Sequence, residues 1–71
     1  MLIPSWVKMR EIVWWKYRDG DRVLCRVGAI GSDWFSMTIL CATPEQVLHI
    51  RRGCGEQVNV GWQDGLIELA R

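Results

Sequence analysis

Short segments in which apolar and polar residues alternate, separated by glycine- and aspartate-rich turns, constrain this chain more than any other feature. An alternation of period two places the apolar side chains on one face of an extended strand, whereas a helix needs a period near 3.6. In segment 22–30 the face that we expect to be buried carries Val23, Cys25, Val27 and Ala29. In segment 34–41 it carries Phe35, Met37, Ile39 and Cys41, while Trp34, Ser36 and Thr38 face outward. We therefore expect a mainly β protein.

Turn signals join these segments into hairpins. Asp19-Gly20 follows the β-branched and aromatic segment 12–17, and Gly31-Ser32-Asp33 separates the two alternating strands. Gly28 inside a strand predicts a bulge or a close packing contact. A later strand has its inward face formed by Val58, Val60 and Trp62, and segment 66–69 closes the chain. Segment 1–10 is expected to be an extended arm or a short helix, because Pro4 suits a first helical position.

Segment 43–53 supports two interpretations. As a helix, it has Thr43 as N-cap, Pro44 at the first position and Gln46 closing a capping box. As a strand, it has Pro44 opening a turn and residues 47–52 pairing in a second hairpin. The local signals do not separate the two.

The small size of the chain limits what its core can contribute. At 71 residues we expect a single domain, 1–71, that buries only about 60% of the surface exposed by its unfolded form. Self-association would supplement such a core. The hydrophobic fraction of 49% includes five Trp, so we expect some of these rings at the surface or between subunits.

Charge and cysteine content limit what can be said about partners and compartment. Nine Lys and Arg against eight Asp and Glu give a net charge of +1, so long-range electrostatics selects no partner. The three cysteines show no C-x-x-C spacing and follow no signal-like leader, so we expect reduced thiols in the cytoplasm. We predict no metal site and no cofactor, and no membrane span, because no apolar run approaches the ~20 residues that a span needs.

The regular spacing of short strands favours a small barrel of five strands, since closure removes exposed sheet edges. Gly20-Asp21-Arg22-Val23, Thr43-Pro44-Glu45 and Val58-Asn59-Val60 with Leu66 resemble, over residues 20–69, the type II dihydrofolate reductases of plasmids and integrons. Gly-Asp-x-Val and Trp34-Phe35 also resemble Tudor domains. Both resemblances imply an SH3-like barrel with a strand at 47–52. The alternative is an α+β fold, an antiparallel sheet with a helix at about 44–52.

The resemblances do not extend to the residues that carry chemistry. The reductases line a pore of a homotetramer with Val-Gln-Ile-Tyr, where this chain has Val58-Asn59-Val60-Gly61, and a cofactor-holding lysine would fall near Cys25. The reductase resemblance thus implies architecture, oligomerisation and an origin on a mobile element, but no reductase activity. A Tudor methyl-ammonium cage would need more aromatic residues than Trp34, Phe35 and Trp62.

Large rings and cations are the candidate binding residues. Trp14 and Trp15 are consecutive in a strand, so they must face opposite sides, one of them the core. Trp34 shares its face with polar residues and is expected to be exposed. We predict a binding site drawn from Trp14, Trp15, Tyr17, Trp34, Trp62, Asn59, Arg22, Arg26 and Arg51.

The leading hypothesis is a non-catalytic, self-associating SH3-like interaction module that binds a protein partner through exposed aromatic residues. One alternative is a barrel that binds nucleic acid with Arg22, Arg26, Arg51 and Trp34, because cations beside exposed rings suit single strands. The other is a reductase-like enzyme at an oligomer pore formed by Asn59 and Val60.

Overall fold

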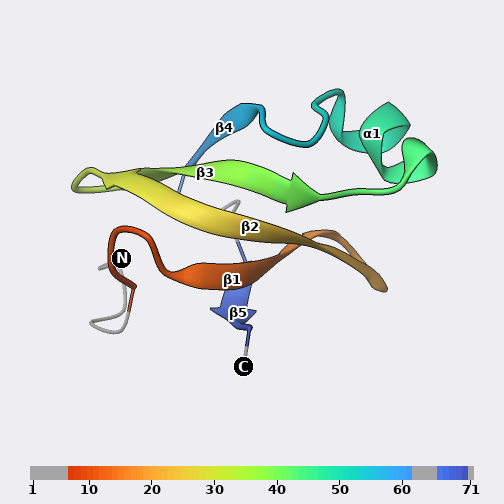
Figure 1. Ribbon diagram of the computed structural model, residues 1–71. Helices are drawn as coiled ribbons and strands as arrows, with labels where there is room; N and C mark the ends of the chain where they lie inside the picture. Colours follow the sequence, from red (N-terminus) through yellow and green to blue (C-terminus); the bar gives the residue numbers. More distant parts are fainter. Residues whose placement is uncertain (1–6, 62–65, 71) are drawn as a thin grey trace.

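The computed structural model describes residues 7–61 and 66–70, and these form five strands and one helix (Figure 1). In chain order the elements are β1 (Ile12–Arg18), β2 (Asp21–Ile30), β3 (Trp34–Cys41), α1 (Pro44–Ile50), β4 (Gln57–Gly61) and β5 (Leu66–Leu69). The prediction of a mainly β, five-stranded fold is confirmed. Of the expected N-terminal arm or helix, residues 7–10 are a non-helical segment that ends in a turn, and 1–6 lie outside the described residues.

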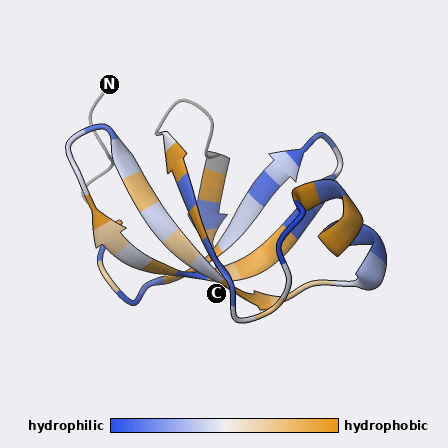
Figure 2. Cartoon of the chain, turned by 90° about the horizontal axis from the view of Figure 1, so that it is seen from above, coloured by the Kyte–Doolittle hydropathy of each residue, from blue (hydrophilic) through white to orange (hydrophobic). Residues whose placement is uncertain are grey.

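The strands form one antiparallel sheet in the order β4-β3-β2-β1-β5. The last strand returns to pair with the first, with Val13 opposite Leu69 and Trp15 opposite Ile67. Viewed along a second direction, the strands curve around a common interior, as in a small barrel (Figure 2). Within the part of the chain that the structure describes, β4 and β5 do not pair, so each is an edge strand.

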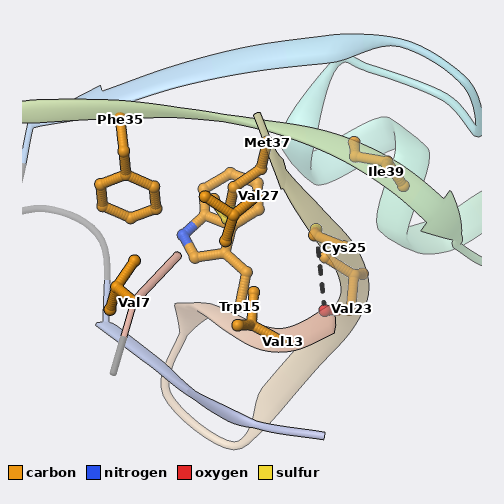
Figure 3. Close-up of a cluster of buried hydrophobic side chains, with 9 residues drawn as sticks. All are labelled: Val7, Val13, Trp15, Val23, Cys25, Val27, Phe35, Met37 and Ile39. Atoms are coloured by element: carbon orange, nitrogen blue, oxygen red, sulfur yellow. Dashed lines mark hydrogen bonds between the residues drawn. The ribbon is translucent and has the colours of Figure 1, made fainter. Parts of the chain in front are cut away.

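The core fills the concave side of this curved sheet (Figure 3). Its buried apolar side chains are Val7, Val13, Trp15, Val23, Cys25, Val27, Phe35, Met37 and Ile39. Tyr17, Val58, Val60 and Ile67 pack against them. The alternation predicted for β2 and β3 therefore holds over most of both strands.

Two interruptions of the strand ladder move single residues off the predicted face. The register of β2 against β3 shifts between Val27 and Ile30, where the Ala29 N–H donates to Ser36 Oγ at 2.9 Å. Ala29 is consequently exposed and Ser36 buried, contrary to the predicted faces. Gly28 lies at this bulge, as predicted, because a Cβ there would approach Ser36 Oγ to 2.8 Å.

The second shift lies between Leu24 and Cys25, opposite the end of β3. Leu24 pairs with Cys41, whereas Cys25 pairs with Ile39, so β3 has one extra residue at this point. A bulge of this kind breaks the period-two alternation. Cys41 is therefore exposed rather than buried as predicted.

The strand expected at 47–52 is wrong, because residues 47–50 belong to α1 and Arg51 is its C-terminal cap. Thr43 and Gln46 form both hydrogen bonds of a capping box, and Pro44 begins the helix. The helix ends at Ile50, followed by Arg51 in the left-handed conformation with φ 64°. The capping residues therefore decide the structure of this segment, which is helical as the alternative with a helix at about 44–52 predicted.

Candidate binding site

A hollow of about 590 Å³ opens on the outer, convex side of the sheet, where the chain enters β1. Its lining comes from the N-terminal turn, the start of β1, the middle of β2 and β3. The lining residues are Met9, Arg10, Ile12, Arg26, Val27, Gly28 and Thr38. We call this the Arg10 hollow.

The turn that forms one wall is held to β2 by backbone hydrogen bonds. The Arg10 N–H donates to the Val27 carbonyl at 2.7 Å, and the Val27 N–H donates to the Glu11 carbonyl at 2.8 Å. Within the turn, the Glu11 N–H donates to the Lys8 carbonyl at 3.1 Å. Arg10 has φ 69°, a left-handed conformation that non-glycine residues adopt at a cost of about 1 kcal/mol. The backbone contacts with Val27 hold it there.

The other wall of the Arg10 hollow is formed by residues that the register of the sheet brings side by side. Arg26 on β2 lies opposite Ile12 on β1 and opposite Thr38 on β3, so all three side chains share the outer face. Gly28 lines the hollow with its backbone, because Ser36 Oγ would stand 2.8 Å from a Cβ at this position. Neither guanidinium of Arg10 or Arg26 has an ion-pair or hydrogen-bond partner among the described residues, and both side chains are exposed.

Next to this hollow, four apolar side chains occupy the outer face of β1, β2 and β3. Ile12 and Leu40 are each 36% exposed, and Trp14 and Leu24, which are directly opposite each other, are partly buried. We call Ile12, Trp14, Leu24 and Leu40 the outer patch. Ile12 belongs to both the patch and the hollow, so the two surfaces are continuous.

The far border of the outer patch is a charged group around Glu68. Arg22 donates to Glu68 at 2.8 Å, and Lys16 lies 3.3 Å from the same carboxylate. These hydrogen bonds lower the pKa of Glu68 below its ordinary value. The Arg22 guanidinium also lies 4.4 Å from the centre of the Trp14 ring. Arg22 is thus already paired and stacked, unlike Arg26.

A second hollow, of about 470 Å³, lies between β4 and the end of α1. It brings together three residues of the predicted site, Trp15, Arg51 and Asn59. The other lining residues are Ile50, Arg52, Gln57, Val58 and Val60. The predicted site is therefore divided, because Arg51 lies in this hollow and Arg26 in the other.

One member of the Trp14-Trp15 pair lies in the core, as the strand geometry required, and it is Trp15, which is 9% exposed. Its indole N–H has no hydrogen-bond partner within residues 7–61 and 66–70. In Figure 3 the indole nitrogen is on the side of the ring that faces Val7 and Phe35. Trp15 is therefore mainly a structural residue that exposes one edge.

Tyr17 also has a structural place. Its hydroxyl donates to Asp21, and burial together with this hydrogen bond raises the pKa of Tyr17. The Arg18 guanidinium contacts both Asp21 at 3.4 Å and His49 Nε2 at 3.1 Å. These contacts connect the β1–β2 turn to α1 rather than form a ligand site.

The remaining predicted residues lie apart from both hollows. Trp34 is 42% exposed, as expected, and its indole occupies the space in which a Cβ of Gly31 would stand. Trp62 lies outside the described residues. Sequence reasoning missed Met9, Arg10 and Thr38 as site residues. Arg10 carries no sequence signal of its left-handed backbone, and the position of Thr38 opposite Arg26 follows from the sheet register, which the sequence alone does not show.

The cysteines differ in their surroundings. Burial raises the pKa of Cys25 to about 12, so this thiol stays protonated at neutral pH. Cys41 and Cys54 are exposed, and all three thiols are free.

Among the residues that the structure describes, no group of three or more His, Cys, Asp or Glu is placed to hold a metal ion. None of the described helices is long and apolar enough to cross a bilayer.

Comparisons with protein-family models, curated proteins and solved structures give no significant match to this chain. The resemblances to type II dihydrofolate reductases and Tudor domains therefore stay predictions. What the fold and the site define is a small, mainly β domain with a continuous apolar and cationic surface on its convex side.

Proposed function

We propose that this chain is a non-catalytic binding module that docks an extended, acidic segment of a protein partner on the outer face of β1, β2 and β3. The observation that carries the proposal is the continuity of the outer patch with the Arg10 hollow through Ile12. Apolar side chains provide the contact area of a protein interface, and unpaired cations at its border select acidic partners.

Charge complementarity favours an acidic occupant of this face. Arg26 stands at the border of the patch without a carboxylate partner in the described chain, whereas Arg22 is already paired with Glu68. A carboxylate brought by a partner would supply the missing counter-charge.

A nucleic-acid partner is supported less well. Arg22 is stacked on Trp14 and paired, Arg51 lies in the second hollow, and Trp34 lines neither hollow. The cations and rings of that hypothesis therefore do not all share one surface.

The reductase-like alternative is supported less well too. Asn59 and Val60 both line the second hollow, and no observation assigns chemistry to them. A cytoplasmic location is supported by the free cysteines, and an origin on a mobile element rests on the reductase resemblance alone.

The test compares substitutions of two exposed leucines, one inside the outer patch and one outside it. A random peptide library displayed on phage is selected on the immobilised protein, and the selected peptides are titrated while Trp fluorescence is followed. Leu40→Lys, in the outer patch, should weaken their binding at least tenfold. Leu48→Lys is the matched control, because Leu48 is 78% exposed on α1 and lies outside the patch. Equal binding by both variants would refute the proposal.

Oligomeric state gives the other decisive result. Sedimentation equilibrium should show that the wild-type protein is a monomer, which leaves the outer patch free in solution. A dimer that Leu40→Lys dissociates would mean that a second copy occupies this face, and would replace the proposed partner by self-association.

A further inference from the structure

We infer that the Arg10 hollow is a specificity pocket that receives a carboxylate carried next to an aliphatic side chain of the bound segment. The inference rests on the proposed function, because it names what the partner must present at one end of the outer patch.

The first support is the uneven pairing of the cations on this part of the sheet. Arg22 and Lys16 share Glu68, and Arg18 contacts Asp21 at 3.4 Å. Arg10 and Arg26 line one hollow, and neither has an ion pair within residues 7–61 and 66–70. Two unpaired arginines that line one hollow are suited to a carboxylate or a phosphate, which a guanidinium can bind through two parallel hydrogen bonds.

The second support is the backbone of Arg10. Two non-glycine residues in the described chain have a positive φ, Arg10 and Arg51. Arg51 follows a helix end, where the left-handed conformation is common. Arg10 lies in a turn that follows the non-helical residues 7 and 8, and glycine would adopt φ 69° without cost. A strained residue held by tertiary contacts points to a role for its side chain, here at the wall of the hollow.

The third support is the apolar part of the lining. Met9 is 66% exposed and Ile12 is 36% exposed, and both border the hollow beside Val27. These side chains suit an aliphatic group of the ligand. Among residues 7–61 and 66–70, those that line the hollow include no aromatic ring on which a base could stack. Stacking on rings is a main source of affinity for single-stranded nucleic acid, so the lining favours a peptide carboxylate over a nucleic-acid phosphate.

The probe for this pocket is 4-methylpentanoate, which carries a carboxylate and a branched aliphatic group, with 4-methylpentanamide as its neutral counterpart. Titrations are followed by the NMR signals of the arginine Nε–H groups. The carboxylate should shift the Arg10 and Arg26 signals in a saturable manner, and the amide should bind at least tenfold more weakly. Equal binding of the two compounds would refute the inference.

Arg10→Gly is the decisive variant, because it removes the guanidinium while relieving the positive φ. It should lower the affinity for 4-methylpentanoate at least tenfold and leave the thermal midpoint unchanged or raised. Arg51→Gly is the matched control, since it removes the same charge at the other positive-φ residue. Similar losses for both variants would show a general charge effect and overturn the pocket.

The remaining outcomes separate this inference from the proposed function. Selected peptides that are weakened by Leu40→Lys but unaffected by Arg10→Gly would leave the binding module in place and refute the pocket. If 4-methylpentanoate binding depends on Arg10 but the selected peptides are insensitive to Leu40→Lys, the pocket stands and the proposed binding face is refuted. Inorganic phosphate or an oligothymidylate that shifts the Arg10 signal at lower concentration than the carboxylate would assign the hollow to phosphate and overturn the inference.

Discussion

The side-chain amide of Gln46 donates a hydrogen bond to the Asp21 carboxylate at 2.8 Å, which ties α1 to the turn between β1 and β2. The same nitrogen donates to the Arg22 carbonyl at 3.0 Å, while the amide oxygen accepts from the Thr43 N–H at 2.9 Å. Gln46 thus acts both as the capping-box residue and as the tertiary anchor of a helix that buries none of its residues fully. A seven-residue helix is too short to be stable alone, so we expect this anchor to hold it.

Replacing this anchor should loosen α1. Gln46→Ala should lower the free energy of unfolding by about 1–2 kcal/mol, because it removes a helix cap and a hydrogen bond to a charged group. Urea unfolding followed by Trp fluorescence measures the change. Glu45→Ala is the control, because Glu45 is exposed and its carboxylate lies 3.9 Å from Arg18. Equal stabilities of the two variants would contradict the role assigned to Gln46.

Acid should destabilise the protein through two surface carboxylates. Hydrogen bonds from Tyr17 and Gln46 lower the pKa of Asp21 below its ordinary 3.8, and those from Arg22 and Lys16 lower the pKa of Glu68 below its ordinary 4.5. A carboxylate with a lowered folded-state pKa stabilises the fold above its unfolded pKa, and this contribution disappears as the pH falls through the folded value. Stability should therefore be constant near neutral pH and decline below about pH 4.

The variants Asp21→Asn and Glu68→Gln test this assignment. Each should be less stable than wild type at pH 7 and show a shallower loss on acidification, measured by urea unfolding at a series of pH values. Asp33→Asn is a control that removes a carboxylate for which no such contact is described. A wild-type pH profile in both Asp21→Asn and Glu68→Gln would assign the acid sensitivity to other groups.

The close approach at the β2 bulge predicts a coupled pair. Gly28→Ala should destabilise the fold by about 1–3 kcal/mol, because the new Cβ would stand 2.8 Å from Ser36 Oγ. Removing that oxygen in Gly28→Ala/Ser36→Ala should relieve the clash, so the double variant should be more stable than the sum of the single changes predicts, by about 1 kcal/mol. Strict additivity in urea unfolding would show that the two positions do not interact.

The three thiols should react at different rates. Cys41 and Cys54 are exposed and should react rapidly with a thiol reagent at pH 8. Cys25 is buried with its pKa raised to about 12, so it should react only when the core opens. Labelling of a Cys41→Ala/Cys54→Ala variant isolates this thiol. Its rate should rise with denaturant in step with unfolding, and rapid labelling in native buffer would contradict the burial of Cys25.

Several elements were predictable because their signals are local. The alternation in 22–30 and 34–41 places Val23, Phe35 and Met37 on the buried face, and the structure agrees. The capping residues Thr43 and Gln46 also indicated the helix. The strand expected at 47–52 came from resemblance, and the hydrogen bonds of the capping box show why the local signal was the better guide.

The candidate site was less predictable, because its parts come from separate segments. Arg26 was chosen from its strand face, but its neighbours Arg10 and Thr38 depend on how β2 aligns with the N-terminal turn and with β3. Arg51 and Asn59, chosen for the same site, belong to the other hollow. Residue types alone do not show which residues lie next to a given cation in space.

By itself, the sequence determined the alternating strands 22–30 and 34–41, the turns beside them and the capping box at the start of the helix, because each depends on residues close together in the chain. The tertiary structure alone decided which tryptophan of the Trp14-Trp15 pair enters the core, where the two bulges of β2 and β3 lie, and that Arg10 takes a left-handed conformation beside Arg26. The physical reason is that register and strain are set by hydrogen bonds between distant segments, such as that from Arg10 to Val27, which no local pattern encodes.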